Sequence, residues 1–128
     1  MLFRSPRHEY QWRLALALLK RIDEETRRLG AELIIVGVPY LAQVYDEIWA
    51  VTFGGEERYS RTAATARVRE WCESEGIPYV ETLDAFRERV GESARWLHFP
   101  KDAHPTPEGH GLIAETVLRS GEIGRAHV

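Results

Sequence analysis

Two short apolar runs, each following a glycine that ends a predicted helix, constrain the fold of this chain most strongly. Gly30 precedes the run LIIV at 33–36, and Gly76 precedes the run IPYV at 77–80. The first run is continuous rather than alternating, which is typical of a parallel strand covered on both faces. A repeated order of helix, glycine and short strand indicates the α/β class. We therefore predict a three-layer α/β domain with a doubly wound, flavodoxin-like parallel sheet that includes strands at 31–38 and 77–80.

The segments before these two strands have helical patterns. From about residue 10 to residue 29, residues at helical i, i+3 and i+4 spacing are expected to form an inner face. They are Ala15, Leu18, Leu19, Ile22, Thr26 and Leu29. A second helix is predicted over 60–74. Residues 43–59 have no settled period and are expected to form a cap or insert, in which Tyr45 and Trp49 are candidates for substrate contact or for a local packing cluster.

The balance of charged residues argues against two classes of partner. The formal net charge is -3, from 17 Lys and Arg against 20 Asp and Glu. This balance gives neither the basic surface of a nucleic-acid-binding protein nor a polybasic stripe for anionic lipid. No apolar run approaches the roughly 20 residues of a membrane span, so no membrane segment is expected. The single cysteine, Cys72, excludes a disulfide within the chain.

The candidate site is the loop that precedes the last predicted helix. Residues 99–110 have the sequence FPKDAHPTPEGH, in which Thr106 is expected to cap a helix that begins at Pro107. A neutral imidazole accepts a proton near pH 7, and a nearby carboxylate can fix its tautomer. Asp102 and His104 are therefore predicted to be two members of a nucleophile-activating relay. The nucleophile must come from elsewhere.

The segment DAHPTPEGH at 102–110 resembles the last sequence block of the SGNH, or GDSL-type, serine hydrolases. In that family an Asp and a His stand just before the final helix. The resemblance implies that His104 is the general base and that Asp102 orients it. One residue, Ala103, separates the two here, whereas the common family form has two residues between them. The family's Gly-Asp-Ser block and its oxyanion-hole Gly and Asn blocks have no match in this sequence, so the resemblance covers the C-terminal part of such a domain only.

This resemblance implies a serine esterase as the parent protein. We expect residues 1–121 to be the C-terminal portion of one SGNH hydrolase-like domain whose N-terminal strands and nucleophilic serine are missing, so that the fragment alone is inactive. The substrate is expected to be a small-molecule, lipid or carbohydrate ester, and no cofactor is required. We expect 122–128 to be a non-native tail, because IGRAHV at 123–128 matches one reading frame of a common sequencing-library adapter.

Two residues at the end of the first predicted strand are candidates for substrate binding. Ligands of open α/β sheets lie beyond the carboxyl ends of the strands. Pro39 ends the predicted strand at 31–38, so Pro39 and Tyr40 are expected at the rim of a cleft that they share with Asp102 and His104. The alternative is that both are ordinary loop residues.

The sequence suggests three alternatives to an ester hydrolase. One is a non-catalytic α/β binding module on the same scaffold, in which Asp102 only caps a turn. Another is an acyltransferase that acts on carbohydrate. The third is a metal site built from His98, Asp102, His104 and His110, but their spacing matches no recognised zinc motif. We therefore expect no metal, and we interpret His98 and His110 as structural histidines.

Overall fold

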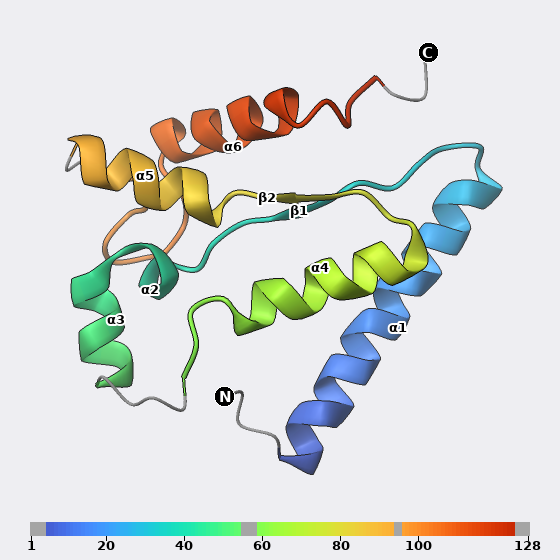
Figure 1. Cartoon of the computed structure of the whole chain (residues 1–128), viewed down its shortest axis with the longest axis horizontal. Coiled ribbons are helices and arrows are strands. Elements are labelled where there is room, and N and C mark those ends of the chain that lie inside the picture. The colour runs from blue at the N-terminus through green and yellow to red at the C-terminus, as the bar shows by residue number, and fades with distance from the viewer. Residues whose placement is uncertain (1–4, 55–58, 94–95, 125–128) are drawn as a thin grey trace. The chain divides into compact units, whose positions relative to one another are not determined.

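The computed structural model describes residues 5–54, 59–93 and 96–124 of the chain. These residues form six helices and two short strands (Figure 1). In chain order they are α1 (Pro6–Arg28), β1 (Ile35–Gly37), α2 (Leu41–Val44), α3 (Asp46–Phe53), α4 (Ala63–Glu75), β2 (Tyr79–Glu81), α5 (Leu83–Ser93) and α6 (Pro107–Arg119). The chain divides into two compact units, one of residues 1–35 and 57–79 and the other of residues 36–56 and 80–128.

The predicted three-layer, doubly wound sheet is wrong. Across the described ranges the only sheet is the parallel pair β1 and β2, and most of the remaining structure is helical. The Ile35 N–H donates to the carbonyl of Pro78 at 3.0 Å, and the Thr82 N–H donates to the carbonyl of Gly37 at 3.3 Å. Because Pro78 has no N–H to donate, β2 begins only at the next residue. The strand predicted at 31–38 is limited to Ile35–Gly37, and the strand predicted at 77–80 is observed at Tyr79–Glu81.

The burial of the strands explains why their apolar character was misleading. All three residues of β1 are only half-buried, and in β2 only Val80 is buried. A continuous apolar run suits a strand enclosed on both faces, but it suits a partly covered two-stranded ribbon as well. The order of helix, glycine and strand is present twice, as predicted. It does not determine how many further strands join the sheet.

In the first unit, α1 and α4 are connected by charged side chains. The Arg67 guanidinium donates two hydrogen bonds of 3.0 Å to the carboxylate of Glu9 and lies over the ring of Trp12, 4.8 Å from its centroid. At the last residue of α4, the Glu75 carboxylate accepts from the Lys20 ammonium group at 2.7 Å. These contacts fix which side of α1 faces α4.

The predicted inner face of α1 differs from the observed one. Leu18, Ile22 and Leu29 are 57%, 49% and 74% exposed. The covered side instead carries Asp23, which is buried, and a row of half-buried residues, namely Trp12, Leu16 and Leu19. Asp23 accepts from Arg27 Nε at 3.1 Å through both carboxylate oxygens. Both sides of α1 carry apolar rows, so the helical period identified the helix but not its covered side.

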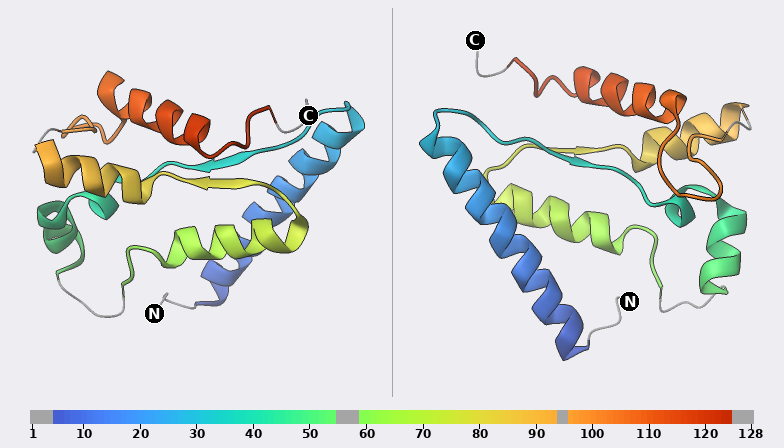
Figure 2. Two further views of the ribbon diagram at one scale, coloured as in Figure 1. Left: turned by 45° about the horizontal axis from the view of Figure 1, so that its top comes forward. Right: turned by 180° about the vertical axis from the view of Figure 1, so that it is seen from behind.

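The second unit has a core of apolar side chains contributed by α2, α5, α6 and the loop before α6. Its buried members are Leu41, Val44, Tyr45, Leu83, Phe86, Leu97 and Leu112. In Figure 1 and in both views of Figure 2, α5 and α6 run side by side. Tyr45 has an extended backbone (φ -102°, ψ 121°) and separates α2 from α3. The helical register restarts there, so the segment 43–59 shows no single period; its residues 55–58 lie outside the described part.

The last helix begins as predicted. Thr106 Oγ1 accepts from the Gly109 N–H at 3.2 Å, and Pro107 is the first helical residue. Gly109 is buried, and a Cβ at this position would overlap the carbonyl oxygen of Leu97. The start of α6 therefore packs directly on the backbone of the loop. In the tail predicted at 122–128, residues 125–128 lie outside the described residues.

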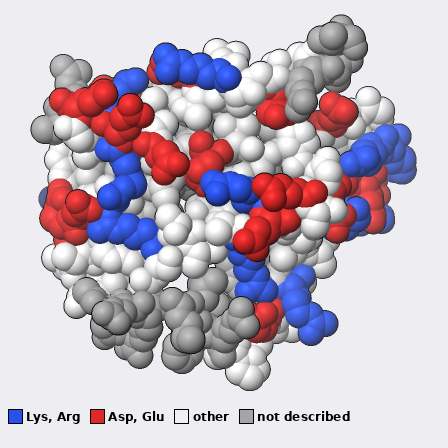
Figure 3. Space-filling model, viewed as in Figure 1, with Lys and Arg blue, Asp and Glu red and all other residues white. Residues whose placement is uncertain are grey.

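One face of the molecule carries charged side chains of both signs. Figure 3 shows acidic and basic groups intermixed on this face. Within the described residues, no helix combines the length and the hydropathy that crossing a membrane requires.

Two glycines of α6 provide a matched test of this packing. Gly109→Ala should lower the free energy of unfolding by about 1–3 kcal/mol, because the backbone of Leu97 must move to admit the methyl group. Gly111→Ala, where the added Cβ meets nothing within 4 Å, should raise it by about 0.5–1 kcal/mol. Urea unfolding of the two variants measures both values. Equal effects at the two positions would contradict the close approach at Gly109.

Candidate functional site

The loop between α5 and α6 is closed by its own backbone. The Thr106 N–H donates to the Leu97 carbonyl at 2.9 Å, and inside this pair the Phe99 N–H donates to the His104 carbonyl at 2.8 Å. The Ala103 N–H also donates to the Phe99 carbonyl, at 3.0 Å. These bonds form a tight hairpin whose tip carries the candidate catalytic residues.

The tip of this hairpin explains the short spacing between the Asp and the His. Ala103 has a φ of 60°, in the left-handed region that residues other than glycine seldom adopt. The chain reverses at this residue, so Asp102 and His104 meet although only one residue separates them. Asp102 Oδ1 accepts from the His104 N–H at 2.9 Å and from His104 Nδ1 at 3.0 Å.

The hydrogen bonds at the tip favour the carboxylate form of Asp102 and select one tautomer of the neutral His104 ring. The His104 backbone N–H, and then its ring N–H, hold the pKa of Asp102 below its ordinary value of 3.8. A carboxylate acceptor at Nδ1 requires the proton on that nitrogen, so in the neutral imidazole Nε2 carries the lone pair. The side chains of His104 and Asp102 are 80% and 62% exposed. A reacting group can therefore approach Nε2 from solvent.

The base of the hairpin is held by a second, buried histidine. His98 Nε2 donates to the Pro39 carbonyl at 3.1 Å, and His98 Nδ1 lies 3.4 Å from the hydroxyl of Tyr45. Burial lowers the pKa of His98, which favours the neutral ring that this pair of contacts requires. The side chain has no exposed surface. Its place supports the interpretation of His98 as a structural histidine.

Tyr45 connects this histidine to the rest of the second unit. Its hydroxyl accepts from the Leu97 N–H at 2.8 Å and from the His98 N–H at 3.2 Å, and the remaining hydroxyl proton points to His98 Nδ1. Burial raises the pKa of Tyr45, so the phenol stays protonated. The ring also contacts Trp96, with 4.4 Å between the centroids. The sequence indicated a packing role for Tyr45 as one alternative, but no local signal indicated its bonds to residues more than 50 positions away.

Pro39 and Tyr40 use their described hydrogen-bonding groups for contacts other than the Asp–His pair. Pro39 is buried and its carbonyl is used by His98, whereas Tyr40 is 59% exposed. In the part of the chain that the structure covers, no hydrogen bond joins either residue to Asp102 or His104. Pro39 thus supports the base of the hairpin, and a role in substrate binding stays a prediction for both residues.

The serine hydroxyls near the ends of the helices have local partners. Ser5 caps α1, Ser60 lies 3.5 Å from the Thr62 hydroxyl, and Ser74 and Ser120 donate to carbonyls of their own helices. The side chain of Ser93 lies outside the described residues. None of the described hydroxyls bonds to His104. Among the described residues, no group of three or more His, Cys, Asp or Glu side chains is placed to hold a metal ion.

Comparisons with known proteins give no relative from which a function is transferable. The chain matches no protein-family model, no curated protein and no solved structure.

Replacing Tyr45 by Phe tests the buried support of the hairpin. Tyr45→Phe leaves the N–H groups of Leu97 and His98 buried without an acceptor, so it should lower the free energy of unfolding by about 2–4 kcal/mol. Tyr10→Phe, at a tyrosine that is 64% exposed, is the matched control and should change it by less than about 0.5 kcal/mol. Denaturant unfolding measures both. Similar values for the two variants would contradict the role of the Tyr45 hydroxyl.

The pKa of Asp102 tests the contacts at the tip. It should lie below 3.8 because the folded loop favours the carboxylate. The stability that this preference contributes is present above the unfolded-state pKa and is lost as the pH falls through the lowered, folded-state pKa. In His104→Ala the backbone bond remains and the ring bond is lost, so the pKa should rise while staying below 3.8. Carboxyl ¹³C shifts followed through an acid titration measure it; an identical pKa in the variant would contradict the ring bond.

Proposed function

We propose that this chain supplies the general base of an ester hydrolase of the SGNH type, with His104 as the base and Asp102 as the residue that orients it. The observation that carries the proposal is the 3.0 Å contact between Asp102 Oδ1 and His104 Nδ1 on a backbone-closed hairpin. This contact directs the unprotonated Nε2 away from the carboxylate. The resemblance of residues 102–110 to the last block of these hydrolases supports the same assignment.

The reaction follows from the chemistry of the pair. His104 Nε2 removes the proton of a serine hydroxyl as that oxygen attacks the carbonyl carbon of an ester. The imidazolium that results is stabilised by the Asp102 carboxylate, and it returns its proton to the departing alcohol. Water then repeats the cycle on the acyl-enzyme. If an acceptor alcohol, such as a carbohydrate hydroxyl, replaces that water, the same groups carry out acyl transfer.

The nucleophile of this proposal is supplied by polypeptide outside this chain. The described serine hydroxyls are engaged locally, and none reaches His104. Cys72, the single cysteine of the chain, is fully buried, and burial raises the pKa of its thiol. A His104 side chain that is 80% exposed leaves space for a serine to approach.

A non-catalytic binding module is the second candidate. It is favoured by the same exposure of His104 and by the buried Tyr45–His98 contacts, which hold the hairpin without any help from a nucleophile. The two candidate functions predict different results when the His104 imidazole is removed. An ester hydrolase would lose its catalytic activity, whereas a binding module has no such activity to lose.

The test uses the product of the longest reading frame that contains this chain, assayed with p-nitrophenyl esters. His104→Ala should lower kcat/KM about a thousandfold or more, since it removes the base itself. Asp102→Asn should lower kcat/KM by a smaller factor, because the amide still offers an oxygen to His104 Nδ1. His110→Ala, at an exposed histidine in the first turns of α6, is the matched control and should leave the rate within about twofold of wild type.

Two outcomes would contradict this function. An unchanged rate in His104→Ala would refute the base assignment, and an inactive wild-type product would favour the binding module. The 128-residue chain alone should not react with a serine-directed fluorophosphonate. Stoichiometric labelling of the chain alone would identify one of its own serines as the nucleophile.

A further inference from the structure

The solvent-facing side of α1 carries an apolar row that no described residue covers. Four residues spaced one turn apart make up this row, which we term the α1 outer stripe. They are Tyr10, Leu14, Leu18 and Ile22, with exposures of 64%, 46%, 57% and 49%. Isolated apolar residues on a surface are ordinary, but a contiguous row along one helix is typical of an interaction surface.

The outer stripe is distinct from the side of α1 that packs in the first unit. That side carries the buried Asp23 and is connected to α4 through the pairs Glu9–Arg67 and Lys20–Glu75. Because those contacts fix the rotation of α1 about its own axis, the outer stripe remains free to accept a partner.

The spacing of the outer stripe is self-complementary. When a second copy of α1 runs antiparallel to the first, Tyr10 lies opposite Ile22 of the other copy, and Leu14 lies opposite Leu18. An antiparallel copy of α1 therefore places each member of the outer stripe opposite another member. A twofold axis requires this property of an interface, since the same patch must serve both subunits.

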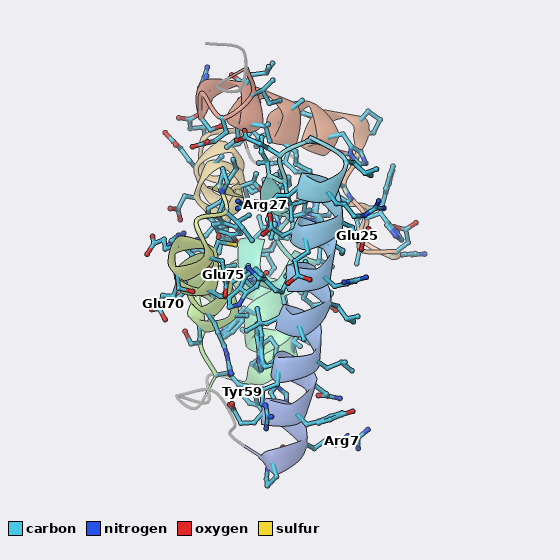
Figure 4. The ribbon with its side chains drawn as sticks, turned by 90° about the vertical axis from the view of Figure 1, so that its right-hand side faces the viewer. Arg7, Glu25, Arg27, Tyr59, Glu70 and Glu75 are labelled. Carbon is cyan, nitrogen blue, oxygen red and sulfur yellow. The ribbon has the colours of Figure 1, made fainter. Side chains whose placement is uncertain are left out.

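The charges at the two ends of the outer stripe complement one another in the same arrangement. Arg7 precedes the outer stripe and Glu25 follows it, about five helical turns later, on the same side of α1. Figure 4 shows Arg7 and Glu25 near opposite ends of the helix, whereas Arg27 and Glu75 lie toward its other side. In an antiparallel pair each Arg7 faces a Glu25. In a parallel pair like charges would face each other.

Glu25 is able to accept this additional partner. It already forms ion pairs of 2.9 Å with Arg21 and Arg28 on its own helix. A carboxylate has about four acceptor positions, so a third donor is accommodated. Arg21, which also flanks the outer stripe, is placed opposite Gln11 of the second copy and meets no cation there.

We propose that the α1 outer stripe is a homodimer interface, in which a second copy of this chain packs antiparallel along α1 with Arg7 opposite Glu25 at both ends. The seam of one helix pair is at the small end of specific interfaces, so the dissociation constant is expected to be on the order of 10 µM. The dimer is independent of the proposed esterase chemistry, because none of its residues belongs to the hairpin.

Sedimentation analysis of the full chain over a range of concentrations tests the interface. Wild type should show a discrete monomer–dimer equilibrium. Leu18→Glu should weaken it by at least about a hundredfold, because the charge is buried twice in a symmetric dimer. Leu118→Glu, at a 68% exposed leucine on α6, is the matched control and should leave the equilibrium unchanged. Circular dichroism of each variant confirms that the helices are retained.

Exchanging the terminal charges tests the antiparallel register. Arg7→Glu and Glu25→Arg should each weaken the dimer about 3- to 10-fold, and the double variant should recover wild-type affinity to within about twofold. Arg13→Glu, which makes the same charge change on another side of α1, should have no effect. A wild-type chain that is monomeric at about 100 µM, a dimer that tolerates Leu18→Glu, or a double variant no tighter than the single ones would each overturn the proposal.

Discussion

The candidate site depends on the hydrogen bonds of the Tyr45 hydroxyl. A buried phenol is costly unless its oxygen and its proton both find partners, and here the oxygen accepts two backbone N–H groups while the proton reaches His98. This arrangement fixes where the chain enters the hairpin. The start of α6 then packs against the Leu97 carbonyl through Gly109, which fixes where the chain leaves it. The tip is held between two anchored ends.

The two histidines of this loop show that environment, rather than residue type, sets their roles. His98 is fully buried, and burial lowers its pKa and so favours the neutral ring. Both of its ring nitrogens contact protein groups, namely the Pro39 carbonyl and the Tyr45 hydroxyl. His104 lies on the exposed tip and uses only Nδ1 for a protein contact, which leaves Nε2 available. An imidazole with one ring nitrogen bonded to a carboxylate and the other open to solvent has the geometry that the proposed general base requires.

The features that were predictable from sequence are those determined by neighbouring residues. The start of α6 follows from the local capping by Thr106, and the meeting of Asp102 with His104 follows from their short separation and the turn at Ala103. The size of the sheet was not predictable, because strand pairing is non-local and the apolar runs do not specify their neighbours. The contacts of Tyr45 and the covered side of α1 were missed for the same reason. Both depend on segments distant in sequence, and α1 carries apolar rows on two sides.

In the candidate site, Asp102 holds the neutral His104 ring with its proton on Nδ1 and its lone pair on Nε2. Long-range ¹H–¹⁵N correlation spectra of the histidine rings, recorded at a pH where the imidazole is neutral, report this directly. We expect a protonated Nδ1 and an unprotonated Nε2 for His104 in the wild type, and a mixture of the two tautomers in Asp102→Ala. A His104 ring in wild type that is protonated at Nε2, or that is already a mixture unaffected by Asp102→Ala, would contradict this assignment.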